Sequence, residues 1–217
     1  MPPIVRANPI EVANRLHQLG WRREQLLEIV GAMVAARNSC TENDPSSAPG
    51  WMAWKEGTRR LREIARPMGL EKDETGQIPS VIDLRRGLKF AVSNTDDGTG
   101  IEDRIPQNRS RKGPATDRVV CDNQGSLLRA LDKTLDVVPI SMARKQPGII
   151  VCWYLCVYCQ EDEVRAELSC PVSFESDYFT DFVERIVLIG PDGDGAIKVR
   201  RDTPEDGPEF DIPVSRR

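Results

Sequence analysis

The chain of 217 residues contains a single histidine, His17. One imidazole excludes any metal site that needs two histidines. His17 falls inside an expected helix, which favours surface or interfacial packing over a catalytic role. Two glycine-rich phosphate motifs are also missing: no segment matches the loop that ends in Gly-Lys-Ser or Gly-Lys-Thr, and none matches GxGxxG after a strand.

Long apolar runs are missing as well. No window reaches about 18 consecutive apolar residues, so we expect no membrane-spanning helix and no membrane partner. The first six residues lack the apolar run of a secretory signal peptide. We therefore expect a cytoplasmic protein, in which the six cysteines remain reduced thiols.

The chain has no excess of positive charge: 30 Lys and Arg residues stand against 34 Asp and Glu residues, a formal net charge of -4. This balance argues against a histone-like or membrane-coating protein, whose affinity depends on overall positive charge. The length suits one domain. Within it we expect a helical part over residues 1–68, a sheet with two helices over 78–201 and a polar tail over 202–217.

Three helices are predicted in the helical part. The first begins after Asn8, a capping residue, and ends at Gly20. The second covers residues 22–38 and the third covers residues 51–66. Because the second helix soon becomes strongly apolar, its sequence favours a packed helical hairpin over a DNA-reading helix-turn-helix.

The third helix carries a basic face with the candidate anion-binding residues Arg59 and Arg62. Pairing with Glu56 and Glu63 on the same helix is the simpler explanation of that face. The functional explanation is contact with phosphates or with an acidic partner.

Trp51 and Trp54 fall on or near the apolar side of the third helix. This position favours packing in the core, whereas exposed rings would offer surfaces on which nucleic-acid bases stack.

Alternating runs over residues 80–84 and 88–92 flank Gly87 and predict a hairpin. Residues 148–159 and 164–170 predict a second pair of strands. The strand over 148–159 is apolar on both faces, so we expect it at the centre of its sheet.

Two further helices are expected in the C-terminal half. One starts at Asn123 or Ser126 and ends before Pro139, and the other covers residues 175–189. A last short strand is expected over residues 196–200. The fold class is therefore α+β, with an N-terminal helical layer packed on a mixed or mainly antiparallel sheet built from hairpins.

Four cysteines cluster between residues 152 and 170 and raise the possibility of a zinc site. In a strand, Cys152 and Cys156 share one face while Cys159 points to the other, so three thiolates do not converge without a bulge. Apolar packing of these thiols is the preferred interpretation, with zinc binding and redox sensing as alternatives.

The segment over residues 94–118 has little apolar periodicity and is long for a packed domain. Clustered basic residues follow its first carboxylates and complete the set of candidate anion-binding residues: Arg104, Arg109, Arg111 and Lys112. Arginine forks and lysine ammonium groups both suit phosphate oxygens. A plain flexible loop is the competing interpretation.

These patterns favour a cytosolic, non-enzymatic binding protein that needs no cofactor. Its expected partner is nucleic acid held through phosphates, and an acidic protein surface is the other anionic partner considered. The motivation is basic clustering within an otherwise acidic chain.

The main alternative is a metal-dependent phosphodiesterase or nuclease. Asp96 and Asp97 would hold Mg²⁺, Asp83 would assist, and Lys89 would orient a water molecule. Position 87 is Gly where a carboxylate would help, so Asp83 and Lys89 are expected to be exposed hairpin residues. A third possibility is a homo-oligomer or a subunit of a larger assembly.

Overall fold

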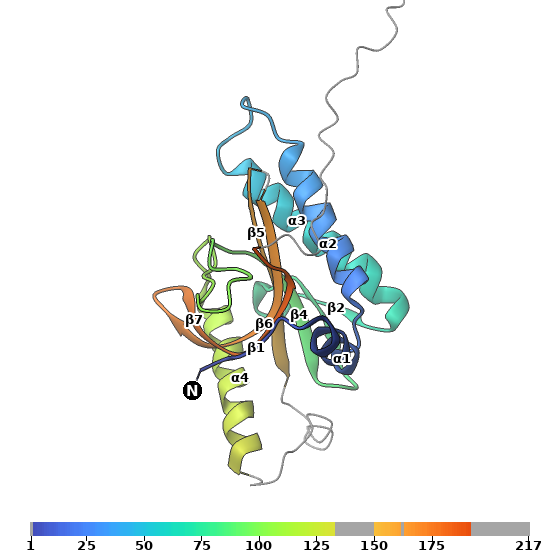
Figure 1. The fold of residues 1–217 in the computed structure, drawn as a ribbon, viewed down its shortest axis with the longest axis vertical. Coiled ribbons are helices and arrows are strands. Elements are labelled where there is room, and N and C mark those ends of the chain that lie inside the picture. Colours follow the sequence, from blue (N-terminus) through green and yellow to red (C-terminus); the bar gives the residue numbers. More distant parts are fainter. Residues whose placement is uncertain (1, 133–149, 162, 192–217) are drawn as a thin grey trace, which may run out of the picture.

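The structure is a computed structural model that describes residues 2–132, 150–161 and 163–191, with the side chains of residues 126–132 left aside. Within these residues, four α-helices and a seven-stranded mixed sheet form the fold (Figure 1). The predicted α+β class is confirmed. No helix in this part of the chain is long and apolar enough to cross a lipid bilayer.

The three N-terminal helices follow their sequence signals closely. They are α1 (Pro9–Leu19), α2 (Arg23–Asn38) and α3 (Ala48–Ala65). The side chain of Asn8 accepts hydrogen bonds from the first backbone N–H groups of α1, as a capping residue does. Gly20 ends that helix at a φ of 87°, a conformation that glycine adopts without strain.

The seven strands join segments from both ends of the chain. They are β1 (Ile4–Arg6), β2 (Glu71–Asp73), β3 (Ser80–Asp83), β4 (Leu88–Asn94), β5 (Val151–Gln160), β6 (Glu163–Glu175) and β7 (Tyr178–Ile189). Their order is β1-β7-β6-β5-β4-β3-β2. The pairs β1/β7 and β4/β5 are parallel, and the others are antiparallel. The edge strands β1 and β2 have three residues each, too short for an alternating pattern to predict them.

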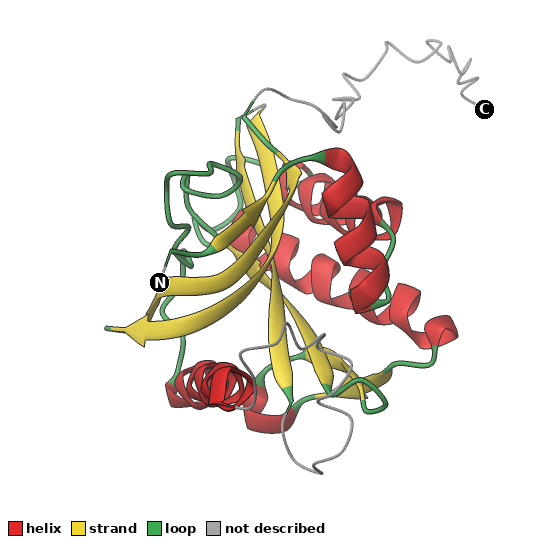
Figure 2. Cartoon of the chain, turned by 60° about the horizontal axis from the view of Figure 1, so that its bottom comes forward, coloured by secondary structure: helices red, strands yellow, loops and turns green. Residues whose placement is uncertain are grey.

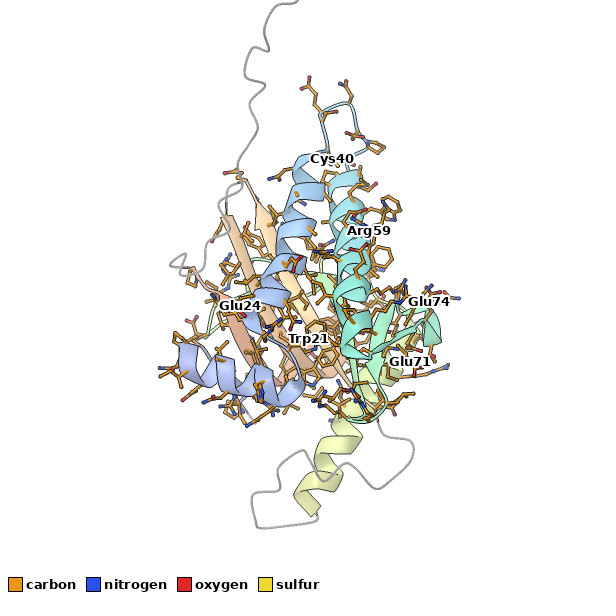
Figure 3. All side chains as sticks on the ribbon, turned by 90° about the vertical axis from the view of Figure 1, so that its right-hand side faces the viewer. Trp21, Glu24, Cys40, Arg59, Glu71 and Glu74 are labelled. Atoms are coloured by element: carbon orange, nitrogen blue, oxygen red, sulfur yellow. The ribbon has the colours of Figure 1, made fainter. Side chains whose placement is uncertain are left out.

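Helices cover both faces of the sheet (Figure 2). On one face, α1, α2 and α3 bury the larger core, which contains Trp21 (Figure 3). The Trp21 ring meets Phe90 edge-on, with 5.4 Å between the ring centroids. On the other face, α4 (Pro114–Asp132) packs through Val120 against a smaller aromatic cluster that includes Tyr154 and Phe179. β5 therefore lies buried between two layers, as its two-sided apolar sequence predicts.

The helix expected over residues 175–189 was wrong, because this segment is β7. Ser176 and Asp177 adopt positive φ values of 52° and 75°, which reverse the chain in a tight turn after β6. Register shifts then interrupt the β6/β7 ladder, for example between Cys170 and Pro171. These bulges interrupt the alternation of buried and exposed side chains along β7. Phe179 and Phe182 therefore face the same core at a spacing of three residues, which is also typical of a helix.

The helix expected to start at Asn123 or Ser126 begins earlier, at Pro114, a residue that suits the first helical turn. The irregular segment after β4 is consequently confined to residues 95–113. The end of this helix before Pro139, the strand expected over 196–200 and the tail over 202–217 fall outside the described residues. The expectation of a single domain stays a prediction.

Candidate nucleic-acid interface

A pocket of about 730 Å³ opens where β4 lacks a neighbouring strand on one side. β3 pairs with β4 only from Leu88 to Ala91. Beyond this point the loop becomes the neighbour through a bridge between Thr95 and Asn108. Val92 and Ser93 are paired with β5 alone, whereas the carbonyl oxygen of Asn94 already accepts a 3.0 Å hydrogen bond from the backbone N–H of Arg109. The sheet therefore has a gap beside these two residues.

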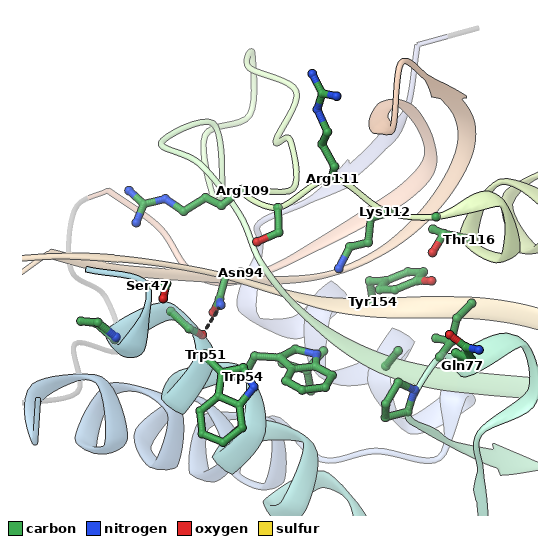
Figure 4. A pocket seen from close by; sticks show the side chains of 18 of the residues that line it. Ser47, Trp51, Trp54, Gln77, Asn94, Arg109, Arg111, Lys112, Thr116 and Tyr154 are labelled. Carbon is green, nitrogen blue, oxygen red and sulfur yellow. Dashed lines mark hydrogen bonds between the residues drawn. The ribbon is translucent and has the colours of Figure 1, made fainter. Parts of the chain in front are cut away.

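The first turns of α3 form one wall of the pocket, and residues 109–113 of the loop form the opposite wall (Figure 4). The side-chain amide of Asn94 donates a 2.7 Å hydrogen bond to the carbonyl oxygen of Gly50, which ties the start of α3 to β4. The pocket is bounded elsewhere by the segment that enters β3, by Thr116 of α4 and by Tyr154 of β5.

Four cationic side chains line this pocket: Arg37, Arg109, Arg111 and Lys112. No Asp or Glu belongs to its lining in the part of the chain that the structure describes. Arg109 has neutral neighbours, since its guanidinium lies 5.6 Å from the Tyr158 ring centroid and donates to the Gln160 amide oxygen at 3.3 Å. Among the described residues, none of the four cations has a carboxylate partner within ion-pairing distance.

Lys112 occupies a half-buried position in the loop wall. Its side chain reaches into the pocket next to the Tyr154 ring (Figure 4). Burial lowers the pKa of the Lys112 ammonium, because removal from water disfavours the charged form. An anion that enters the pocket would offset this loss of hydration and favour the charged state.

The loop wall is held by Asn108, which is buried. The Asn108 side chain donates to the carbonyl oxygens of Ser110 and Asp177, at 2.7 and 2.9 Å, and accepts from the backbone N–H of Phe179 at 2.9 Å. The backbone N–H of Lys112 also donates to Asp177, at 3.2 Å. Residues 108–112 are thus fixed against the turn between β6 and β7.

Trp51 and Trp54 lie one turn apart on α3 and both line the pocket. The expectation that Trp51 packs in the core was wrong, because its side chain is 56% exposed. The pocket opens where β3 no longer flanks β4, so the first turns of α3 have no strand to cover there. The Lys55 ammonium lies 5.9 Å from the centroid of the Trp51 ring. Two indoles that share a pocket with cations lacking carboxylate partners among the described residues form a surface suited to bases and phosphates.

The other predicted anion-binding residues are held by carboxylates outside the lining of this pocket. Arg59 pairs with Glu56 and Glu63 on α3 (Figure 3), at 2.6 and 2.8 Å. Hydrogen bonds from Lys55 and Arg59 lower the pKa of Glu56. Arg62 forms an ion pair with Glu74, with 3.1 Å between Arg62 Nη2 and Glu74 Oε1.

Arg104 forms two 2.9 Å hydrogen bonds with the Asp97 carboxylate. Of the six candidate anion-binding residues, the structure therefore brings together the three from 109–112 and pairs the remaining three with acidic side chains.

Asp83 and Lys89 are buried, which corrects the expectation of exposed hairpin residues. Asp83 is 2% exposed and accepts hydrogen bonds from the backbone N–H groups of Arg85 and Arg86, so it shapes the turn between β3 and β4. Lys89 lies 2.7 Å from the Asp73 carboxylate. The Asp83 charge is compensated by Arg86 in the same turn, whereas Lys89 is compensated by Asp73 of β2, a partner that local spacing does not indicate.

The carboxylates of the alternative metal site have structural partners. Asp96 accepts hydrogen bonds from the backbone N–H groups of Gly98 and Gln107, and Asp97 pairs with Arg104. In the described ranges, no three His, Cys, Asp or Glu side chains come together as metal ligands would. The nuclease hypothesis stays a prediction that no observed arrangement favours.

The cysteines of β5 divide between the two cores. Cys152 and Cys156 face α4, whereas Cys159 faces α1, α2 and α3, as their spacing predicts. Burial raises the pKa of Cys152 to about 12 and raises that of Cys170 even further. These thiols therefore stay protonated and pack as small apolar groups.

Sequence reasoning missed Arg37, Asn94 and Tyr154 as pocket residues. Arg37 had one local signal, because it is the only basic residue in the apolar second half of α2. Asn94 and Tyr154 lie in strands and reach the pocket only because of the gap beside β4.

No protein-family model, curated protein or solved structure matches this chain.

Proposed function

We propose that this protein is a nucleic-acid-binding module that holds an unpaired strand in the pocket between α3 and the loop over residues 109–113. The observation that carries the proposal is the set of four cations without carboxylate partners, which share one pocket with Trp51 and Trp54. In this arrangement the cations bind phosphate oxygens and the indole rings stack with bases.

The availability of the cations supports this assignment over the basic face of α3. A phosphate that binds Arg59 has to displace two carboxylates, whereas Arg111 has no carboxylate partner to displace among the described residues. The indole rings favour nucleic acid over an acidic protein surface, because they match the faces of bases. They also favour single strands, since the bases of a duplex are already stacked on one another.

The proposal involves no catalytic step and no cofactor. It places the protein in the cytoplasm, which agrees with six cysteines that are all free thiols. The volume of about 730 Å³ falls within the range of pockets that enclose small organic ligands, so it suits one or two nucleotides.

The first experiment is a fluorescence-anisotropy titration of single- and double-stranded oligonucleotides of one sequence, at low and near-physiological salt. We expect single strands to bind more tightly than the duplex. We also expect the affinity to fall with salt, because bound phosphates release counterions. The absence of binding to every oligonucleotide at low salt would overturn the proposal.

Two double variants that remove the same charge test the location. Arg109→Gln/Arg111→Gln removes two pocket cations, and Arg59→Gln/Arg62→Gln removes two cations that are paired elsewhere. We expect the pocket variant to lose affinity by about tenfold or more, and its salt slope to fall by about 1.4 for two lost phosphate contacts. Equal losses in the two variants would show diffuse attraction and contradict a site in this pocket.

A further inference from the structure

We propose that the pocket receives the end of a strand, and that Lys112 and Arg111 bind its terminal phosphate, a phosphomonoester. This inference rests on the proposed function and names the part of the nucleic acid that the pocket selects. Three observations support it: the concentration of charge, the lack of a continuing basic track, and the burial of the inner lining.

Positive charge in the loop wall is concentrated within four residues, since Arg109, Arg111 and Lys112 all belong to the segment 109–112. An internal phosphodiester carries one negative charge. A terminal phosphate carries about −1.5 to −2 at neutral pH and presents three oxygens. Lys112 points toward Tyr154 while Arg109 and Arg111 extend away from it (Figure 4), so these long side chains have to turn toward Lys112 to bind the same monoester, which offers charge and oxygens for more than one cation.

Unpaired cations do not continue along the wall that carries the tryptophans. The four basic residues of α3 are each paired with a glutamate: Lys55, Arg59, Arg60 and Arg62. Proteins that bind the middle of a single strand follow its backbone with a basic groove. Within the described residues of α3, that groove is neutralised, so the phosphates beyond the pocket have no such track to follow there.

The pocket is more buried towards its inner lining. Arg111 and Trp51 are exposed, and Lys112 is half-buried. Ala91, Thr116 and Tyr154 are each at most 5% exposed. A group that approaches these inner residues leaves water. This suits the end of a chain, because an internal phosphate would have to bring both flanking sugars inside with it.

Lys112 is the cation best placed to meet such a group. Its side chain points into the pocket beside Tyr154, from a backbone that Asn108 and Asp177 hold in place (Figure 4). The hydroxyl group of Tyr154 is buried near Thr116 and makes no hydrogen bond of ordinary geometry to any described residue. A phosphate at Lys112 supplies the counter-charge that the described surroundings of the lysine lack.

The test compares one single-stranded sequence in five forms: with a 5′-phosphate, with a 5′-hydroxyl, with a 3′-phosphate, with a 3′-hydroxyl and ligated into a circle. Binding is measured by competition against one labelled strand, so that no label blocks an end. We expect one phosphorylated end to bind at least about tenfold more tightly than its hydroxyl counterpart. The two phosphorylated arms distinguish which end is selected.

Lys112→Gln should abolish this preference, and Arg111→Gln, at an exposed position that no fold contact requires, should reduce it. The matched control Arg59→Gln should keep the preference in full. A thermal unfolding curve for each variant separates a lost contact from a lost fold.

Equal binding of the phosphorylated, hydroxyl and circular strands would overturn end recognition and leave the proposed function standing. A preference that persists in both Lys112→Gln and Arg111→Gln would overturn the assignment to this pocket. Failure of every strand to bind would overturn both proposals together.

Discussion

Glu167 of β6 and Arg185 of β7 form an ion pair in which neither side chain reaches solvent, with 2.6 Å between Arg185 Nη2 and Glu167 Oε2. The Glu167 carboxylate also accepts a 2.8 Å hydrogen bond from the backbone N–H of Gly100. Arg185 donates to the carbonyl oxygens of Ile101 and Arg104, at 3.0 and 2.7 Å. Two buried charges of the sheet thus satisfy the backbone of the loop that follows β4.

The first prediction concerns this pair. Glu167→Gln keeps the shape of the side chain but leaves the Arg185 charge buried without its carboxylate. We expect the free energy of unfolding, measured in urea, to fall by about 3–5 kcal/mol. Glu163→Gln on the same strand removes an exposed partner of Arg165 and should cost about 1 kcal/mol at most. Similar losses in both variants would contradict a special role for the buried pair.

The second prediction concerns acid stability. Burial of the Asp73 carboxyl raises its pKa, but hydrogen bonds from Lys89 and Thr75 outweigh this effect and lower the pKa to about 2. A carboxyl whose pKa is lowered by folding contributes stability above its unfolded pKa, about 3.9, and that stability is lost as the pH falls towards about 2. The shift corresponds to about 2–3 kcal/mol of stability.

Asp73→Asn should therefore flatten the decline in stability between about pH 5 and pH 2, which urea unfolding at several pH values would measure. Glu71→Gln changes an exposed carboxylate on the same strand and should leave the acid profile close to that of the parent protein. An unchanged acid profile in Asp73→Asn would show that the Lys89 pair does not contribute.

The third prediction compares two helical glycines. A Cβ atom on Gly57 would lie 2.5 Å from Met33 Cγ, because α2 and α3 approach closely at this point. Gly57→Ala should therefore destabilise the protein by about 1–3 kcal/mol despite the better helix propensity of alanine. A Cβ on Gly31 of α2 would meet nothing within 4 Å. Gly31→Ala should raise stability by about 0.5–1 kcal/mol, and thermal unfolding of both variants checks the opposite signs.

The fourth prediction concerns base stacking. Trp54→Ala should weaken single-strand binding by about tenfold, since stacking of one base on an aromatic ring contributes about 1–3 kcal/mol. Trp54→Phe keeps an aromatic face and should retain most of the affinity. Anisotropy titrations of both variants measure the difference, and unchanged affinity in Trp54→Ala would remove the indole from the site.

Local chemistry was predictable from the sequence. α1 begins after Asn8 and ends before Gly20, as the capping preferences of these residues indicate. The two-sided apolar pattern of β5 correctly predicts a strand buried between two layers. The ion pair of Arg59 with Glu63 was visible as a spacing of four residues on one helix. Each of these features depends on neighbours within a few positions along the chain.

The pocket was not predictable in the same way. Whether a cation keeps a free charge depends on which carboxylates packing brings near it. Arg104 follows Asp103 directly, yet its two hydrogen bonds go to Asp97, seven positions earlier. The bulged register of β7 likewise arises from pairing with β6, so its apolar spacing alone was misleading. Short-range patterns predicted most of the helices and the central strands, whereas long-range contacts determined β7 and which charges remain available.

The anchoring of the loop also bears on the speed of binding. Glu167, Arg185 and Asn108 hold the segment in place, so the cationic wall exists before a ligand arrives. A strand that binds it then pays little entropy for ordering the protein. The association rate is consequently limited by diffusional encounter, which unpaired positive charge accelerates, and no slow closing motion has to precede capture. Added salt should accordingly act mainly on how fast a strand arrives and much less on how long it stays.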